Sequence, residues 1–437
     1  MNGQFRLGCS SGTSWLSVNP GGIFSATNVK EFLVGYQYGS GIITNEGTMN
    51  LYDVFPGVYG TGVLVNKGNL TIERKLTIGR YASSTGHVIL ESGSTLTKKQ
   101  GGSFPVIVGF GNNTKATLEC YADWTLSAGF QVAHGTNSTG RLVIGADAAV
   151  GTASYVSLGE VPGSRGVLEL RGGTINVKGD SSGHTILMGM DGDTTTGSIL
   201  GWGLISRFNS TLRIKFYGQV IADGEGIERD LNMAMIKTVG TNNTENLNGC
   251  GTNGWFAVNK GRLIYPRAQN CSGSSHPTIG DYPNRATPTV MNSFRYTLVT
   301  KPDGTYYNFA ELYAPDRTDI PPGLPLYSSH DVVAGVWRFG LSSVSNTDDD
   351  PTPASFGGMR LTFRYDWRGM DAENQSLYVY RHDGSANGSW TRVGKAEISS
   401  TANTVTTDAF DASSETWNAG WFAVVAQRPS GMTVIVR

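Results

Sequence analysis

The sequence LTIGRYASSTGHVILESGSTLT, residues 76–97, contains one unit of a repeat that runs through the first half of the chain. Each unit begins with an apolar triplet closed by a small residue, and successive copies close at Gly8, Gly35, Gly79, Gly109, Ala133, Gly159 and Gly189. The 44-residue gap between Gly35 and Gly79 holds an additional unit at residues 62–72. Irregular repeats of this length are typical of a solenoid, in which stacked coils bury the apolar face that a single coil leaves exposed.

A second signature follows the triplet, in which Gly introduces an alternating strand. Aligning Gly86 with Gly140 and Gly166 superposes apolar residues two positions apart, which point to one side of a strand. The predicted inward residues are Val88, Leu90, Leu142, Ile144, Leu168 and Leu170, with Leu118 and Cys120 in a degenerate copy. No long helical period separates the strands, which argues against a βαβ array. Residues 1–217 are therefore expected to form a right-handed parallel β-helix of about seven to eight rungs.

The pattern changes after residue 217. Residues 218–330 hold short aromatic strands and much of the proline, so we expect a capping and linker region. Cys250 and Cys271 flank an insertion there, where either a disulfide, which is favoured, or two free thiols would fit. Residues 331–437 show strands at about ten-residue spacing, and Leu361, Phe363 and Tyr365 share one strand face. This pattern predicts an antiparallel β-sandwich, and hence an all-β chain.

Composition narrows the possible partners. The chain has a net charge of −1 and 59 Gly among 437 residues, and only 16% of its residues are charged. Near-neutral charge gives no electrostatic basis for binding nucleic acid or an anionic membrane. No run of 18 apolar residues is present, so no membrane-spanning segment is expected. No Cys/His spacing indicates zinc, and neither a metal nor another cofactor is expected.

Three segments resemble a known group of proteins. The repeats are similar to the β-helical repeats of autotransporter-like surface proteins secreted by bacteria. Residues 218–233 and 251–266 resemble the segment that closes such β-helices in large exported proteins with carboxy-terminal sorting tags. Residues 376–394 and 420–427 resemble the small β-sandwich that precedes the tag. The resemblance implies export and an extracellular or cell-surface location, and this group shares no catalytic residues that it would assign here.

An enzymatic function needs separate consideration, because parallel β-helices also include polysaccharide lyases and glycoside hydrolases. Acid–base hydrolysis requires two carboxylates about 5 to 9.5 Å apart. The aligned outward positions hold no stacked column of acids; they are His87, Ile89, Arg141, Val143, Val167 and Glu169. We therefore expect no catalytic residue on these strands.

Three further acidic or basic segments have simpler explanations. Asp191 and Asp193 could form a carboxylate pair, but Asp-Gly-Asp is a common tight turn. Arg213-x-Lys215 matches a short sequence motif of pectin-cleaving β-helical enzymes, but the other motifs of that family are missing from this sequence. Residues 348–350 form an acidic loop for which calcium binding or plain solvation can be considered. We expect none of these residues to be a catalytic, cofactor or metal site.

A polysaccharide remains a possible partner through aromatic rings of the expected sandwich. Sugars can stack on exposed rings, whereas buried rings only fill the core. The candidates are Trp367, Trp390, Trp417 and Trp421.

The expected function is that of a non-enzymatic extracellular structural or adhesive protein: a secreted cell-surface, matrix or filament-forming component. The alternative is a carbohydrate-active β-helix enzyme, such as a polysaccharide lyase or glycoside hydrolase, or a polysaccharide-binding module. The repeat already runs at Phe5, so the first coil presents an open strand edge. A preceding segment, a partner protein or the far end of another copy could cover this edge. Self-association through the solenoid end is the expectation, and such head-to-tail contact between unlike surfaces would give filaments.

Overall fold

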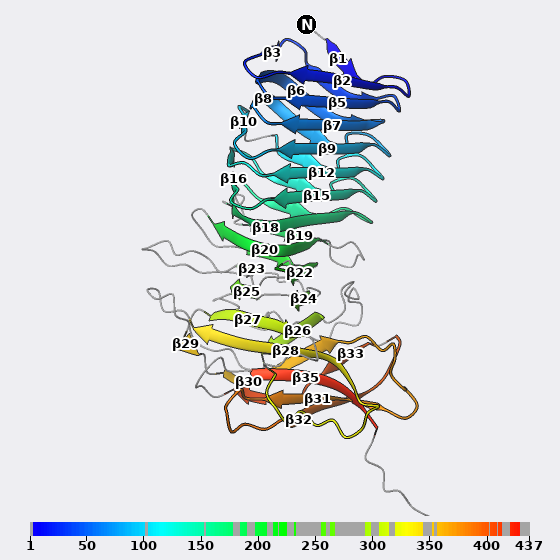
Figure 1. Cartoon of the computed structure of the whole chain (residues 1–437), viewed down its shortest axis with the longest axis vertical. Coiled ribbons are helices and arrows are strands. Elements are labelled where there is room, and N and C mark those ends of the chain that lie inside the picture. Colours follow the sequence, from blue (N-terminus) through cyan, green and yellow to red (C-terminus); the bar gives the residue numbers. More distant parts are fainter. Residues whose placement is uncertain are drawn as a thin grey trace, which may run out of the picture. The chain divides into compact units, whose positions relative to one another are not determined.

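The structure is a computed structural model in which two units are described. It covers residues 3–100, 104–152, 154–177, 184–189, 197–207, 213–216, 218–224, 231–232, 255–258, 263–266, 293–298, 306–313, 320–343, 352–353, 356–401, 403–408, 410–412 and 420–428. Within these ranges every regular element is a strand (Figure 1). The first unit is a parallel β-solenoid of about seven turns, and the second consists of antiparallel sheets, so the expected all-β class is confirmed.

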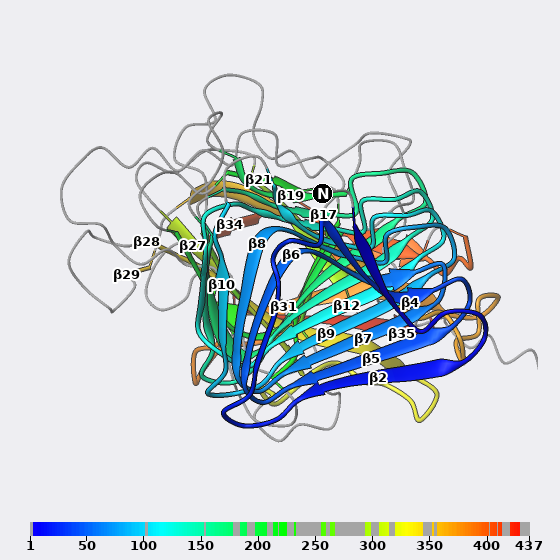
Figure 2. The same cartoon turned by 90° about the horizontal axis from the view of Figure 1, so that it is seen from above.

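Each solenoid turn contributes to three parallel sheets, which surround a common core in the end-on view (Figure 2). The first sheet contains the apolar triplets. Its strands, in order, are β1 (Gln4–Leu7), β4 (Glu31–Tyr36), β6 (Thr48–Val58), β8 (Asn69–Ile78), β11 (Val106–Val108), β14 (Phe130–Val132), β17 (Val156–Leu158), β19 (His184–Met188) and β21 (Arg213–Phe216).

The second sheet contains the alternating strands that Gly introduces. It consists of β2 (Thr13–Val18), β5 (Ser40–Asn45), β7 (Thr61–Asn66), β9 (Thr85–Leu90), β12 (Lys115–Cys120), β15 (Thr139–Ile144) and the first parts of β18 (Arg165–Val177) and β20 (Ser198–Arg207). The third sheet contains β3 (Ile23–Ala26), the first parts of β6 and β8, β10 (Thr95–Lys98), β13 (Trp124–Leu126), β16 (Ala149–Thr152), the second parts of β18 and β20, and β23 (Leu231–Asn232).

The predicted alignment of the second sheet is confirmed. Gly86, Ala116, Gly140 and Gly166 are register partners on β9, β12, β15 and β18. The inward residues that this alignment predicts are all at most 1% exposed; they are Val88, Leu90, Leu118, Cys120, Leu142, Ile144, Leu168 and Leu170. Each therefore stacks on its counterparts in neighbouring turns and forms the solenoid core.

The long gap in the repeat contains a copy of the apolar triplet that the sequence analysis missed. Val54 on β6 pairs with Phe32 on β4 and with Leu76 on β8, so Val-Phe-Pro-Gly at residues 54–57 occupies the triplet position. Pro56 concealed this copy, because proline is rarely expected inside a sheet. The additional unit predicted at residues 62–72 supplies β7 and the first part of β8 of the following turn.

The closing residue of each triplet adopts a left-handed backbone conformation. Its φ angle is +74° at Gly8, +73° at Gly35, +79° at Gly57 and +70° at Gly79. Glycine reaches this region without a Cβ clash, which explains why a small residue recurs at this position. Ala133 closes its copy with a φ angle of +59°.

The second unit contains two antiparallel sheets. In the first, the order is β25 (Leu263–Pro266), β27 (Tyr306–Tyr313), β28 (Val332–Ser343), β35 (Gly420–Gln427), β31 (Ser376–His382) and β32 (Thr391–Glu397), with β29 (Thr352–Pro353) beside β28. The second contains β24 (Trp255–Val258), β26 (Ser293–Leu298) and β30 (Phe356–Arg364), which pairs with both β33 (Thr404–Thr406) and β34 (Phe410–Ala412).

Aromatic side chains join these two sheets face to face. The Phe363 ring on β30 lies 4.6 Å from the Trp337 ring on β28 and 5.8 Å from the Phe422 ring on β35, measured between centroids. Leu361, Phe363 and Tyr365 are all fully buried, as their shared strand face predicts. The expected sandwich core is therefore present.

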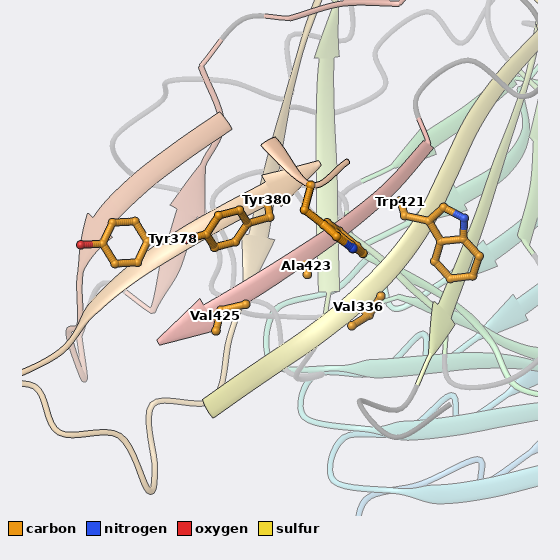
Figure 3. Close-up of a cluster of buried hydrophobic side chains, with 7 residues drawn as sticks. Val336, Tyr378, Tyr380, Trp421, Ala423 and Val425 are labelled. Atoms are coloured by element: carbon orange, nitrogen blue, oxygen red, sulfur yellow. The ribbon is translucent and has the colours of Figure 1, made fainter. Parts of the chain in front are cut away.

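The opposite face of the β28–β35–β31 sheet is also buried. Val336, Trp421, Ala423 and Val425 form a cluster with Tyr378, Tyr380 and Trp390 (Figure 3). Ile320 and Leu324 pack against it, and Trp390 Nε1 donates a hydrogen bond to the Pro321 carbonyl, 3.1 Å away. Two of the four candidate sugar-stacking tryptophans, Trp390 and Trp421, are therefore core residues.

Candidate functional site

The outer face of the second solenoid sheet holds a connected group of polar side chains, which we call the outer network. Its members lie on or next to four successive strands, β9, β12, β15 and β18. They are His87, Glu119, Tyr121, Arg141, Glu169 and Arg171. Strand alternation explains their position, because each strand directs the residues between its core positions outward.

One half of the outer network is centred on the Glu119 carboxylate. His87 Nε2 lies 2.9 Å from Glu119 Oε1, and the Tyr121 hydroxyl donates a 2.7 Å hydrogen bond to Oε2. Burial raises the pKa of Glu119, but the hydrogen bonds from Tyr121 and His87 outweigh it and leave the pKa below its usual value. Burial and the bond to Glu119 raise the pKa of Tyr121. At neutral pH Glu119 is thus an ionised acceptor, not a proton donor.

The other half is centred on Glu169, which is only 5% exposed. Arg141 Nε donates to Glu169 Oε2 at 2.5 Å, and Arg171 Nε donates to Oε1 at 2.6 Å. Arg171 Nη1 also donates to the Tyr121 hydroxyl at 3.3 Å, which joins the two halves. The hydrogen bond to Glu169 raises the pKa of Arg171, so this guanidinium remains charged. Both carboxylates of the outer network are therefore engaged by neighbouring turns.

The sequence analysis identified half of this network. His87, Arg141 and Glu169 point outward as predicted, and the structure brings them together with Glu119, Tyr121 and Arg171, which the analysis missed. The strand register could have identified Glu119 as an outward residue, because Glu119 pairs with Val143, and Val143 pairs with Glu169. Val143 lies at an outward position between these two glutamates but is fully buried.

The structure describes some of the remaining sequence candidates. Lys215 lies on β21, where it pairs with Leu187 of β19. Trp367 is 40% exposed on the second unit. Several candidates lie outside the described residues: Asp191, Asp193, residues 348–350, Trp417, Cys250 and Cys271. In the part of the chain that the structure describes, no three His, Cys, Asp or Glu side chains are grouped so as to hold a metal ion.

The two described cysteines differ in environment. Cys120 is buried at its predicted inward position, and burial raises the pKa of its thiol. Cys9 is exposed at the corner that follows β1. Cys120 is therefore a small apolar core residue, as expected.

Ion pairs also link different turns elsewhere on the solenoid. Arg74 binds Asp53 at 2.5 Å, and Arg80 binds Glu31 at 2.8 Å. Lys99 lies 2.6 Å from Glu73, and the exposed pair of Lys67 and Glu46 is separated by 3.1 Å. These four pairs join residues 21 to 49 positions apart in the sequence, and the contacts of His87 with Glu119 and of Arg141 with Glu169 join residues 32 and 28 apart, so all of them brace one turn against another.

A polar hollow lies on the second unit, at the end of β31 and the start of β32. Its volume is about 350 Å³, and its lining is entirely polar or small: Arg381, Asp383, Asn387, Gly388, Ser389 and Thr391. Asp383 accepts hydrogen bonds from the backbone and hydroxyl of Ser385, which lower its pKa. The hollow thus combines charged and hydroxyl groups at an exposed surface.

Lys98 is a buried amine that the sequence analysis also missed. It occupies an inward position on β10 and is 6% exposed. Its Nζ donates a hydrogen bond to the Gln100 carbonyl. Burial lowers the pKa of the amine from 10.5 to about 8, in spite of the nearby Asp53 carboxylate.

Replacing Lys98 with Met is expected to stabilise the solenoid at pH 7 by roughly 2 kcal/mol. At pH 7 the folded protein contains a buried ammonium group whose charged form burial disfavours. Between pH 8 and 10.5 the folded protein releases a proton that the unfolded chain still holds, so stability of the parent rises with pH. The advantage of Lys98→Met should therefore shrink across this window. Urea unfolding of Lys98→Met and of the parent at pH 7 and pH 10 measures this difference in stability. Lys99→Met, at an exposed position, is the control. A difference that does not change with pH would contradict the lowered pKa of Lys98.

A comparison with protein-family models finds no match, and comparisons with curated proteins and with solved structures find none either. Among the described residues, no helix is long and apolar enough to cross a membrane.

Proposed function

We propose that this chain is a non-enzymatic structural or adhesive component of an extracellular surface, matrix or fibre, of the autotransporter-like kind that its repeats resemble. In this proposal the β-solenoid acts as a rigid spacer that self-associates through its end. The proposal places the protein outside the cell and assigns it no cofactor.

The main support for the proposal is that side chains of the same turn and of neighbouring turns already engage both outward carboxylates. Glu169 lies between two arginines, while Glu119 accepts from His87 and Tyr121. A general acid needs a carboxyl that holds a proton near neutral pH, whereas the pKa of Glu119 is lowered. Interturn ion pairs instead resist the separation of stacked turns, which favours a mechanical role.

The competing function is polysaccharide binding, and the polar hollow supports it. Sugar hydroxyls pair with carboxylate, amide and guanidinium groups such as those of Asp383, Asn387 and Arg381. Among the described candidate rings, Trp390 and Trp421 are buried and offer no open stacking face, whereas Trp367 is 40% exposed.

Replacing Glu169 with Gln is expected to reduce the free energy of unfolding by about 2 kcal/mol, because two arginines lose their shared charged acceptor. Thermal and urea unfolding provide the measurement. The matched control is Glu46→Gln, which removes the exposed pair with Lys67 and should cost less than about 0.5 kcal/mol. Equal effects of the two substitutions would show that the outer network does not brace the turns.

The functional test separates the structural proposal from catalysis. The purified full chain is incubated with neutral and uronic-acid polysaccharides, and reducing ends and unsaturated products are measured. We expect no product above that of heat-denatured protein. Cleavage that is lost in a folded Glu119→Gln or Glu169→Gln variant would overturn the proposal and establish the enzymatic alternative.

A further inference from the structure

The polar hollow of the second unit is built by a single β-hairpin. Arg381 lies near the end of β31, Thr391 lies at the start of β32, and the other lining residues belong to the loop between them. Arg381 and Thr391 are register partners, and the Thr391 hydroxyl donates a 3.3 Å hydrogen bond to the Arg381 carbonyl. All lining residues therefore belong to one continuous segment, residues 381–391.

Hydrogen bonds and close packing hold the loop of this hairpin in place. His382 is buried, and its Nδ1 accepts a 2.9 Å hydrogen bond from Gly384 N. Asp383 Oδ1 accepts hydrogen bonds from both N and Oγ of Ser385, each at 2.9 Å. A Cβ at Gly388 would lie 2.1 Å from Asp383 Oδ1, so the loop closes onto this carboxylate and requires glycine there. The polar groups of the hollow are therefore preorganised for a ligand.

The two charged groups of the hollow differ in their contact with water. The Asp383 side chain is 58% exposed, and the hydrogen bonds from Ser385 lower its pKa, so its charge is hydrated and hydrogen-bonded. Arg381 is half-buried, and burial lowers the pKa of its guanidinium although the Asp383 charge opposes this shift. Because burial removes part of the hydration of Arg381, this cation gains more from a further anion than a fully hydrated one would.

The volume and the remaining groups of the hollow indicate a ligand of the size of a sugar. Its volume of about 350 Å³ lies near the lower end of the range of small-molecule sites, roughly 300 to 1,000 Å³. The Asn387 amide and the Ser389 and Thr391 hydroxyls can both donate and accept hydrogen bonds, as sugar hydroxyls do. A planar guanidinium matches a carboxylate, which it can bind through two parallel hydrogen bonds. A sugar ring that carries a carboxylate would engage both kinds of group.

We propose that the hollow binds one uronic acid residue of an acidic polysaccharide, with the carboxylate on Arg381 and ring hydroxyls on Asp383 and Asn387. This inference rests on the adhesive part of the proposed function and names a ligand for it. An adhesive protein holds such a ligand without cleaving it. The site requires no ring stacking, so the burial of Trp390 and Trp421 does not weaken it.

Isothermal titration calorimetry of the full chain tests this assignment with three probes, which are glucuronate, glucose and acetate. Glucose lacks the carboxylate of glucuronate, and acetate lacks its ring hydroxyls. We expect glucuronate to bind at least about tenfold more tightly than either of the others, because each of them loses one set of hydrogen bonds. Equal binding of glucose or of acetate would overturn the inference, as would an absence of glucuronate binding.

Arg381→Gln tests the residue that distinguishes an acidic sugar from a neutral one. We expect this variant to bind glucuronate at least about tenfold more weakly than the parent, because the charge-assisted hydrogen bonds are lost. Arg392→Gln is the matched control, since Arg392 is exposed on the same hairpin and does not line the hollow. It should bind glucuronate like the parent, and equal losses in the two variants would contradict a specific site.

Asn387→Asp covers the case in which Arg381→Gln does not fold. Asn387 is exposed in the loop, so the substitution is expected to leave the fold intact, which circular dichroism verifies. The added carboxylate should weaken glucuronate binding roughly tenfold through repulsion of like charges. Unchanged binding would contradict the assignment.

The binding measurements and the polysaccharide-cleavage test fail independently. A hollow that does not bind glucuronate would leave the chain a non-enzymatic structural protein. Cleavage products would overturn the proposed function even if glucuronate binds.

Discussion

Replacing Leu142 with Asp is expected to prevent the solenoid from folding. Leu142 is fully buried on β15, between Leu118 on one neighbouring turn and Leu168 on the other. A carboxylate at this position would lose its hydration in a purely apolar stack, and even its protonated form would remain unpaired. We expect a loss on the order of 5 kcal/mol, enough to unfold a protein of ordinary stability. Circular dichroism and urea unfolding of the purified variant provide the measurement.

The control for this prediction lies on the same strand. Thr139 is exposed on β15, so Thr139→Asp introduces the same charge without burying it. This variant should fold and should unfold within about 0.5 kcal/mol of the parent. If Leu142→Asp unfolds like Thr139→Asp, Leu142 does not lie in the core.

The register of the second sheet could be predicted from sequence because glycine marks it. A Cβ at Gly86 would lie 2.5 Å from the Pro56 carbonyl oxygen, and a Cβ at Gly140 would lie 2.4 Å from that of Val108. The position therefore requires a small residue in turn after turn. Once these residues are aligned, the two-residue period of a strand determines which side chains enter the core.

The copy of the apolar triplet at residues 54–57 could not be predicted from its side chains, because it is defined by backbone hydrogen bonding and by a left-handed φ angle. Pro56 lacks an N–H donor and differs from the apolar residue of the other triplets. Its carbonyl nevertheless accepts the hydrogen bond from Gly79 N at 2.8 Å, and Gly57 retains the left-handed φ angle. Apolar composition alone does not reveal these backbone properties.

The outer network could be predicted only in part for a different reason. Outward positions carry no burial constraint, so their identities follow no period that a single sequence displays. His87 and Glu119 are 32 residues apart, and Arg141 and Glu169 are 28 apart, because the corners between strands vary in length. Pairing these side chains requires the register of several turns at once.

Replacing Gly35 with Ala is expected to reduce the free energy of unfolding by about 4 kcal/mol. The φ angle of +73° disfavours any L residue, and the added Cβ would lie 2.1 Å from the Thr61 carbonyl oxygen. That oxygen belongs to the backbone of the neighbouring turn, which cannot move without separating β5 from β7. Urea unfolding of the variant and the parent measures the difference.

Gly109→Ala is the matched control, because Gly109 closes a later copy of the same triplet. Its φ angle of +86° imposes similar backbone strain, but an added Cβ would lie no closer than 3.3 Å to another atom, here the Thr139 carbonyl oxygen. We expect a loss of about 1 to 2 kcal/mol from backbone strain alone. Ala133 already adopts a φ angle of +59° at this repeat position, so the conformation itself is compatible with a Cβ. Equal losses at Gly35 and Gly109 would mean that strain, and not the close approach of adjacent turns, selects glycine at the corners.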